Sequence, residues 1–467
     1  MRSDSEQASR SALEPAEDVL AGPDGDYCRP RCERVAHHDT PRRFYKSAAA
    51  AELDGLAPCP RCRPVLVPQQ PGSDASGRLA QRALALLMTA EGRPDAARLA
   101  AQLDSDESTL TAAFLARFGV TPSQYAQAHA LRLASQLFTD TDLPIAVVAQ
   151  ATGFADSRAL TAALERRHGP ARRARVRGLD APDRVELDLP YQPPHAWHRL
   201  LGFLGGRTID GAESIDAGCY RRTLRVRRDD IEHRGWVEIA AAPSACALRV
   251  TVAPALLPAL PRVLSRVRHV FDLALDPLEV SAVLGELAAD EPGLRLPGAF
   301  DAFELAVRAV LGQQITVKAA RTLAARFTAA FGTPIVTPFS ALDRLFPSAA
   351  AVDALSVDAI ASLGIIGARA RSILGIADAM ASGRLVLEPG VPLEPSLRAL
   401  KALPGIGEWT AQYIAMRALA ASDAFPHTDY GVMKSLAERN PRRVLELAEP
   451  WRPWRAYAVM HLWRRLA

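Results

Sequence analysis

The chain has 467 residues, of which 49% are hydrophobic, 23% charged and 6% aromatic, with a formal net charge of +4. This length predicts about three domains, and the mild charge does not by itself indicate a nucleic-acid partner. Only four basic residues are lysine, an arginine bias that genome composition explains. No 18-residue apolar run and no signal-peptide segment occur, so we expect a cytoplasmic protein without a membrane span.

Residues 1–74 contain a cluster of four cysteines after a polar lead. These cysteines are spaced as two pairs, Cys28 with Cys32 and Cys59 with Cys62. Chance clustering is the alternative to a common role in binding a metal. Four thiolates at such spacings suit tetrahedral Zn²⁺, and a chain of this size with few cysteines is not a disulfide scaffold. The pattern predicts a zinc domain followed by a linker.

The strings CRPRC and FYKSAAAAELDGLAPCPRCRP resemble the methyl-acceptor domain of the adaptive-response regulators. The resemblance implies that Cys28 takes a methyl group from a DNA phosphotriester. Where the family has strands before this cysteine, only GPDGDY stands here, so we expect an N-terminally shortened domain. A structural zinc remnant without methyl transfer is the alternative.

Residues 75–180 show short amphipathic helices separated by Gly and Pro. The segment TDLPIAVVAQATGFADSRALTAALERRHG resembles the second unit of an AraC-type domain, which has two tandem helix-turn-helix units. The resemblance places the turn at Ala149–Gly153 and the recognition helix at Asp156–Arg166, where Arg158 is the best candidate for contacting a base. It implies promoter DNA and RNA polymerase as partners, and a degenerate spacer module is the alternative.

Residues 184–292 contain four alternating runs typical of half-buried strands, RVELDLP, YRRTLRV, GWVEIAAA and CALRVTVA. Residues 293–467 are predicted to be helical throughout. We therefore expect a multidomain α+β protein: a small zinc domain, an all-α tandem helix-turn-helix domain, a mixed α/β domain and an all-α C-terminal domain.

The segment Leu403-Pro404-Gly405-Ile406-Gly407 lies between two helical patterns. Glycines allow a turn tight enough to direct backbone N–H groups at a DNA phosphate, so Gly405, Ile406 and Gly407 are candidate DNA-binding residues. An ordinary interhelical turn is the alternative.

This hairpin is followed by FPHTDYG and EPWRPWRAYAVMHLW, and preceded by LPYQPPHAWHRLLGFLGGR and GLRLPGAFDAFELAVRAVLGQQIT. Together these motifs resemble the inducible bacterial 3-methyladenine glycosylases of the helix–hairpin–helix superfamily, over residues 185–467. The resemblance implies that Asp429 is catalytic. An alkylated purine is a cationic leaving group, and a nearby carboxylate stabilises the positive charge that develops on the sugar. A helix N-cap is the alternative role for Asp429.

The resemblance also implies an aromatic base pocket, whose rings favour a cationic base through cation–π attraction. Its residues are Phe203, Trp409, Tyr413, Tyr430 and Trp463. Ordinary core packing is the alternative for aromatic residues at helical spacing. Gln314 would fill the space left by the extruded base. Strand-nicking relatives carry a lysine where this chain has Trp409, so we expect a monofunctional enzyme that uses water as nucleophile and no cofactor.

These motifs predict a monofunctional DNA-3-methyladenine glycosylase of base excision repair, fused to a regulator of the alkylation response. The alternative is a transcriptional activator that senses methylphosphotriesters and keeps a non-catalytic glycosylase-like arm for scanning DNA. Asp429 and the aromatic set distinguish the two functions, because a scanning arm needs neither. We expect a monomer that acts on double-stranded DNA containing alkylated bases.

Overall fold

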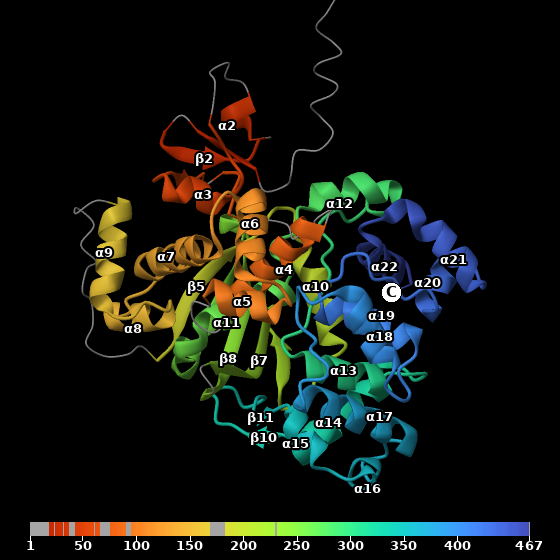
Figure 1. Cartoon of the computed structure of the whole chain (residues 1–467). Coiled ribbons are helices and arrows are strands. Elements are labelled where there is room, and N and C mark those ends of the chain that lie inside the picture. The colour runs from red at the N-terminus through yellow and green to blue at the C-terminus, as the bar shows by residue number, and fades with distance from the viewer. Residues whose placement is uncertain are drawn as a thin grey trace, which may run out of the picture. The chain divides into compact units, whose positions relative to one another are not determined.

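The computed structural model (Figure 1) describes residues 18–22, 24–30, 32–36, 43–59, 61–65, 75–89, 95–168, 183–228 and 231–466. The chain forms two compact units, unit 1 at Met1–Leu179 and unit 2 at Asp180–Ala467. Within the described ranges, no helix combines the length and the hydropathy that a membrane crossing requires.

Unit 1 begins with a four-stranded sheet in the spatial order β3-β1-β2-β4. Its strands are β1 (Val19–Ala21), β2 (Asp26–Cys28), β3 (Phe44–Tyr45) and β4 (Ala57–Pro58). Sequence analysis found only a loop-like segment before Cys28, whereas the structure pairs β1 antiparallel with β2. A three-residue strand is too short to show alternation, which is why the pattern missed it. Cys28 therefore ends an inner strand of a sheet.

Unit 1 contains two short helices beside the cysteine-bearing sheet, and the predicted tandem helix-turn-helix arrangement follows them. The two short helices are α2 (Glu33–Ala36) and α3 (Ala48–Leu53), and the helices that follow are α4 (Ala75–Thr89), α5 (Ala96–Gln102), α6 (Glu107–Phe118), α7 (Pro122–Asp140), α8 (Ile145–Ala151) and α9 (Ser157–His168). The long helix α7 joins the α5–α6 pair to the α8–α9 pair. Asp156 precedes α9 and accepts a hydrogen bond from the Ala159 amide at 2.7 Å, so it caps the recognition helix.

The cysteine-bearing sheet is anchored to the helix-turn-helix part through α3. Arg132 on α7 donates two hydrogen bonds, at 2.8 and 2.9 Å, to the carboxylate of Glu52 on α3. The hydroxyl of Tyr27 also donates to Glu52, at 2.8 Å. Since Glu52 is buried and paired in this way, the two parts of unit 1 are joined by a satisfied polar contact.

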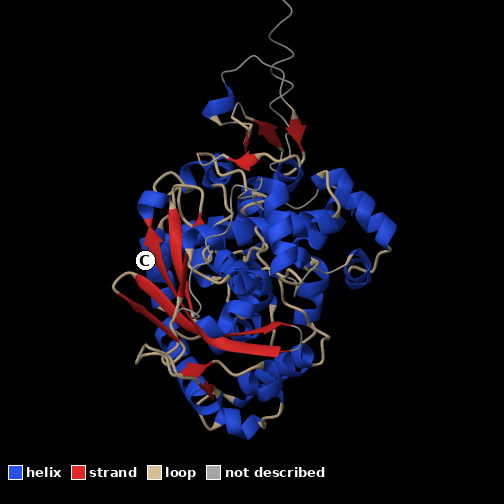
Figure 2. Cartoon of the chain, turned by 90° about the vertical axis from the view of Figure 1, so that its left-hand side faces the viewer, coloured by secondary structure: helices blue, strands red, loops and turns tan. Residues whose placement is uncertain are grey.

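Unit 2 begins with a five-stranded antiparallel sheet in the order β5-β9-β8-β7-β6. Figure 2 shows the strands of the chain in red. Its strands are β5 (Val185–Pro190), β6 (Glu213–Asp216), β7 (Cys219–Arg228), β8 (Ile231–Ala242) and β9 (Ala247–Val252). The four alternating runs in the sequence correspond to β5, β7, β8 and β9, because their inward-facing residues are buried in alternation. The short edge strand β6 was not predicted.

The rest of unit 2 is mainly helical. Its helices are α10 (Trp197–Gly205), α11 (Leu260–Val270), α12 (Pro277–Leu284), α13 (Ala302–Leu311), α14 (Val317–Phe331), α15 (Ala349–Asp353), α16 (Val357–Ala361), α17 (Gly367–Ala381), α18 (Leu393–Lys401), α19 (Glu408–Ala418), α20 (Tyr430–Ser435), α21 (Pro441–Ala448) and α22 (Arg455–Arg464). Helix α13 is buried along most of its length and packs on α14, α17 and α19. The all-helical expectation needs a small correction, because β10 (Thr333–Pro334) pairs with β11 (Arg344–Leu345).

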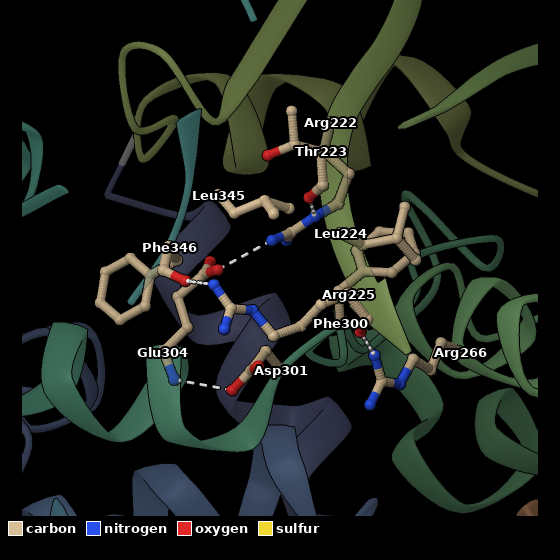
Figure 3. Close-up of a pocket in the computed structure, with 10 residues that line it drawn as sticks. All are labelled: Arg222, Thr223, Leu224, Arg225, Arg266, Phe300, Asp301, Glu304, Leu345 and Phe346. Atoms are coloured by element: carbon tan, nitrogen blue, oxygen red, sulfur yellow. Dashed lines mark hydrogen bonds and ion pairs between the residues drawn. The ribbon is translucent and has the colours of Figure 1, made fainter. Parts of the chain in front are cut away.

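A buried ionic network joins the sheet of unit 2 to α13, and Figure 3 shows part of it. Arg222 on β7 donates to Glu304 on α13 at 2.8 Å and pairs with Glu213 on β6 at 3.3 Å. Arg308 on α13 pairs with both carboxylates. Because Arg222, Glu213 and Glu304 are nearly inaccessible to solvent and Arg308 is mostly buried, each charge depends on the others for its compensation.

Candidate functional site

Asp429 lies at the N-terminus of α20, where three hydrogen-bond donors converge on its carboxylate. The Val432 amide and the Trp463 indole donate to Oδ1 at 2.9 and 2.8 Å. The Trp409 indole donates to Oδ2 at 2.8 Å. Asp429 is therefore the N-cap of α20, as the alternative interpretation stated, but a cap needs only the amide contact. The two indoles, from α19 and α22, are additional donors that fix the orientation of both carboxylate oxygens.

Four of the five predicted pocket aromatics form one cluster beside Asp429. Trp409 stacks on Tyr413 with ring centres 5.3 Å apart, and Trp463 lies 6.3 Å from Tyr413. Phe203 on α10 stacks on Trp463 at 6.2 Å. Tyr430 stands apart: its side chain is exposed at 78%, and the ammonium of Lys434 lies 5.9 Å from its ring.

Two arginines that sequence analysis did not consider lie against this cluster. The Arg207 guanidinium is 3.8 Å from the centre of the Phe203 ring, and Arg417 donates to the Tyr413 hydroxyl at 2.7 Å. Burial raises the pKa of Tyr413, but the two guanidiniums outweigh it and leave that pKa lowered. Each arginine stands four residues after its aromatic partner, so helical spacing was a usable signal.

Gly431 is a second residue that the sequence analysis missed. A Cβ at this position would lie 2.9 Å from Cδ1 of Trp463 and 3.1 Å from Oδ1 of Asp429. Glycine therefore lets the Trp463 ring reach the carboxylate. The DYG sequence shows the glycine, but only the tertiary structure shows that the Trp463 ring from α22 lies close to it.

The predicted hairpin joins α18 to α19. Gly405 has a φ of +79°, and a Cβ there would lie 2.1 Å from Oγ of Ser372. Buried Ile406 anchors the turn, and Gly407 caps α19 without a side chain. The backbone at the start of α19 is thus left uncovered by side chains of the turn itself, which suits contact with a phosphate.

The predicted wedge, Gln314, lies in the loop between α13 and α14. Its side chain is exposed and its φ is +55°, a conformation that is uncommon for residues other than glycine, Asn and Asp. The preceding residue, Gln313, donates from its side-chain amide to the Gly405 carbonyl at 3.0 Å. The wedge loop and the hairpin therefore touch.

The four clustered cysteines of unit 1 meet in space. Their sulfur atoms all lie within 4.8 Å of one another, and Cys28, Cys32 and Cys59 are buried. Tetrahedral Zn²⁺ with Zn–S bonds of about 2.3 Å needs sulfurs about 3.8 Å apart, so this donor set fits the ion. Burial and the neighbouring thiols raise the pKa of Cys28. Burial also raises that of Cys59, but the Cys62 and Arg61 amides and Arg34 lower it to about 7.

The recognition helices expose few side chains able to read bases. Ser108 donates to Asp106, and Thr161 donates to the Ser157 carbonyl at 2.8 Å, so both hydroxyls are engaged locally. Arg158 is exposed in the first turn of α9. Arg158, the residue that the sequence analysis named for a base contact, therefore has its side chain accessible to solvent.

Four family models match the chain in order. The model described as the metal binding domain of Ada matches residues 24–65, and a helix-turn-helix domain matches residues 99–171. The AlkA N-terminal domain matches residues 186–301. The HhH-GPD superfamily base excision DNA repair protein matches residues 307–443, which include the hairpin and Asp429. The order of these matches agrees with the four predicted parts of the fold.

Three curated relatives are similar to this chain at 35% identity. The probable bifunctional transcriptional activator/DNA repair enzyme AlkA of Mycobacterium tuberculosis aligns over 465 residues, 95% of this chain and 91% of that protein. DNA-3-methyladenine glycosylase 2 of Escherichia coli aligns over 280 residues, 59% of this chain and 95% of its own. A Bacillus subtilis DNA-3-methyladenine glycosylase aligns over 192 residues, 37% of this chain and 60% of that protein. The first likeness spans both units.

Proposed function

Because this chain belongs to the family of bifunctional transcriptional activator/DNA repair enzymes AlkA, we propose that it is a DNA-3-methyladenine glycosylase joined to a DNA-binding regulator. Unit 2 hydrolyses the bond between an alkylated purine and its deoxyribose, and Asp429 is the catalytic carboxylate. The observation that carries this assignment is the convergence of the Trp409 and Trp463 indoles on the two oxygens of Asp429.

The environment of Asp429 suits the stabilisation of a cation. Its donors are two indoles and an amide, all uncharged, and no ion pair to Asp429 is found among the described residues. The negative charge is therefore oriented but not neutralised. As the purine leaves, positive charge develops on the sugar, and a carboxylate held in place stabilises it without reorganising. The same carboxylate orients a water molecule for attack on the sugar carbon.

The aromatic cluster is the proposed base pocket. Trp409, Tyr413 and Trp463 line the pocket beside Phe203, whose ring already carries the Arg207 guanidinium. Cation–π attraction to these rings favours the positively charged alkylated base by roughly 0.5–2 kcal/mol. This preference is small, so much of the selectivity comes from the weakness of the glycosidic bond in the damaged nucleotide. Enzymes of this kind also gain from the ease with which a damaged base leaves the stack.

The proposed reaction is monofunctional. Trp409 stands at the position of the Schiff-base lysine of strand-nicking relatives, and its indole is bound to Asp429. Lys401, near the hairpin, is paired with Glu408 at 2.9 Å. With no lysine at the nucleophile position, water completes the hydrolysis and the product is an intact strand with an abasic site.

An excision assay tests the proposal. Methylated duplex DNA should release 3-methyladenine on incubation with the purified chain, and the strand should break only after alkali treatment. Borohydride added during turnover should trap no covalent protein–DNA adduct. Tight DNA binding without any base release would favour the alternative function, a regulator whose unit 2 only scans DNA.

Methyl transfer to Cys28 is a second proposed activity of unit 1. In this step the Cys28 sulfur forms a bond to the methyl carbon of a phosphotriester, the methyl–oxygen bond breaks, and an ordinary phosphodiester anion is left. A zinc ion held by the four sulfurs would keep them as thiolates at neutral pH. Cys28 is fully buried in the free chain, so DNA binding must expose it.

Mass spectrometry tests the methyl acceptor. A cysteine thiolate is the nucleophile that accepts the methyl group, so after incubation with methylated DNA the peptide containing Cys28 should gain about 14 Da, the mass of one added CH₂ unit. Cys28→Ser should lose this gain and keep base excision, because the two sites lie in different units. Stoichiometric zinc binding with no methylated cysteine would show that the cluster is structural.

In the proposed regulator, Arg158 contributes to promoter recognition.

A further inference from the structure

One side chain ties the wedge loop to the hairpin. The Gln313 amide nitrogen donates to the Gly405 carbonyl at 3.0 Å and to Thr410 Oγ1 at 3.0 Å. A backbone carbonyl can only accept, so this contact fixes which end of the amide faces the hairpin. The backbone carbonyl of Gln313 accepts in turn from Arg369 on α17. Gln313 is thus held from two sides.

The residue after Gln313 is the proposed wedge, and its backbone is unusual. Gln314 has a φ of +55° while its side chain is exposed. A residue other than glycine keeps this conformation only where the surroundings hold it, and such residues cluster at functional sites. The contacts of Gln313 are immediately next to it in the chain and supply this support.

The partners of Gln313 belong to the two other working parts of the site. Gly405 shapes the hairpin that faces the DNA backbone. Thr410 is buried on α19, directly after Trp409, whose indole holds Asp429. A shift of the wedge loop relative to either part would therefore stretch a hydrogen bond to Gln313.

We propose that Gln313 is a positioning residue that keeps the wedge in register with the hairpin and α19, so that backbone binding is coupled to base extrusion. The inference rests on the proposed glycosylase function. It predicts that Gln313 matters only when a base must be pulled from a pair and its place filled. A lesion that is already unpaired needs no wedge.

Single-turnover excision from two matched duplexes tests this coupling. Both carry one 7-methylguanine, opposite cytosine in the first duplex and opposite an abasic analogue in the second. Gln313→Met keeps the length of the side chain but removes the donor. We expect it to slow excision of the paired lesion about tenfold, the order of one lost hydrogen bond, and that of the unpaired lesion less than about twofold. Fluorescence of 2-aminopurine beside the lesion should show reduced extrusion.

A control and a double mutant separate positioning from a structural role. Gln412→Met removes two comparable hydrogen bonds from α19, to Glu408 and from the Phe425 amide, away from the wedge loop. Gln412→Met should change the excision rate equally in both duplexes. Adding Gln313→Met to Gln314→Ala should cause little further loss, because the two residues act as one device.

The outcomes divide cleanly. Equal slowing of both duplexes by Gln313→Met, or additive losses in the double mutant, would overturn the coupling while leaving the glycosylase intact. If the unmodified chain excises neither lesion but folds and binds DNA, the proposed function itself fails, and this inference fails with it.

Discussion

Two buried or half-buried carboxylates of unit 2 are held by several donors, Glu213 by four and Asp429 by three, yet their surroundings differ in charge. Glu213, at the junction of the sheet and α13, is bound by the guanidiniums of Arg222 and Arg308, and also by the hydroxyl of Tyr220 and the backbone amide of Ile209. Asp429 is bound by two indoles and one amide. The charge of Glu213 is compensated by the two guanidiniums, whereas Asp429 has no ion-pair partner among the described residues, as its proposed catalytic role requires. This contrast separates a carboxylate that stabilises the fold from one that we propose acts on the substrate.

The largest effect should come from Asp429→Asn. The amide keeps the shape of the side chain but removes the negative charge, so we expect base release to fall about 100- to 1000-fold. DNA binding and the melting temperature should change little, since the charge acts on the transition state. Excision kinetics with methylated duplex DNA measure the loss. Activity within a few-fold of the unmodified chain would remove Asp429 from the mechanism.

The reverse pattern is expected for Glu213→Gln. Removing one member of the buried network leaves Arg222 and Arg308 with Glu304 alone, which should destabilise unit 2 by about 3 kcal/mol or more. The folded fraction should excise bases at the normal rate. Denaturant unfolding and active-site titration of the same sample measure the two quantities. A large rate defect in fully folded protein would break the contrast between the two carboxylates.

Glu213 also predicts how stability depends on pH. Burial opposes ionisation of Glu213, but Arg308 and Arg222 lower its pKa to about 2, below its ordinary value of 4.5. A carboxyl with a lowered folded-state pKa stabilises the fold above its ordinary pKa, and this contribution is lost as the pH falls from about 4.5 towards 2. Glu213→Gln should flatten the stability of unit 2 over this window.

A smaller effect should follow from removing one indole donor. Trp463→Phe keeps a ring facing Phe203 but loses the hydrogen bond to Asp429, so we expect excision to slow about tenfold or somewhat more, as for a bond to a charged group. Trp454→Phe is the matched control. Trp454 is buried elsewhere in the core, so this change should lower stability and leave the rate of the folded enzyme unchanged. Equal rate losses in both variants would indicate packing rather than orientation.

The sequence predicted what local patterns and motifs encode. The alternating runs identified four strands of unit 2, and the motifs around LPGIG and Asp429 located elements that the structure brings together. The buried network of Glu213 was not predicted, because its members come from β6, β7 and α13 and meet only through tertiary packing. Arg207 and Arg417 each lie four residues after an aromatic partner, a spacing that the sequence shows. Only the structure shows that both guanidiniums lie against one aromatic cluster. The strand before Cys28 was too short for any periodic signal.

Tyr430 gives the smallest predicted effect and tests the limit of the resemblance. The motifs placed this ring in the base pocket, yet it is exposed at 78% and stands apart from the other four aromatics. Tyr430→Ala should therefore leave the stability within about 0.5 kcal/mol, as for other exposed positions. If the ring closes over an extruded base, the variant loses contact with substrate and transition state alike. KM should then rise about two- to fivefold, the scale of an exposed cation–π contact, while kcat stays nearly constant. Steady-state kinetics with a methylated oligonucleotide separate the two constants. An unchanged KM would restrict the pocket to the cluster of four rings, two of which hold Asp429.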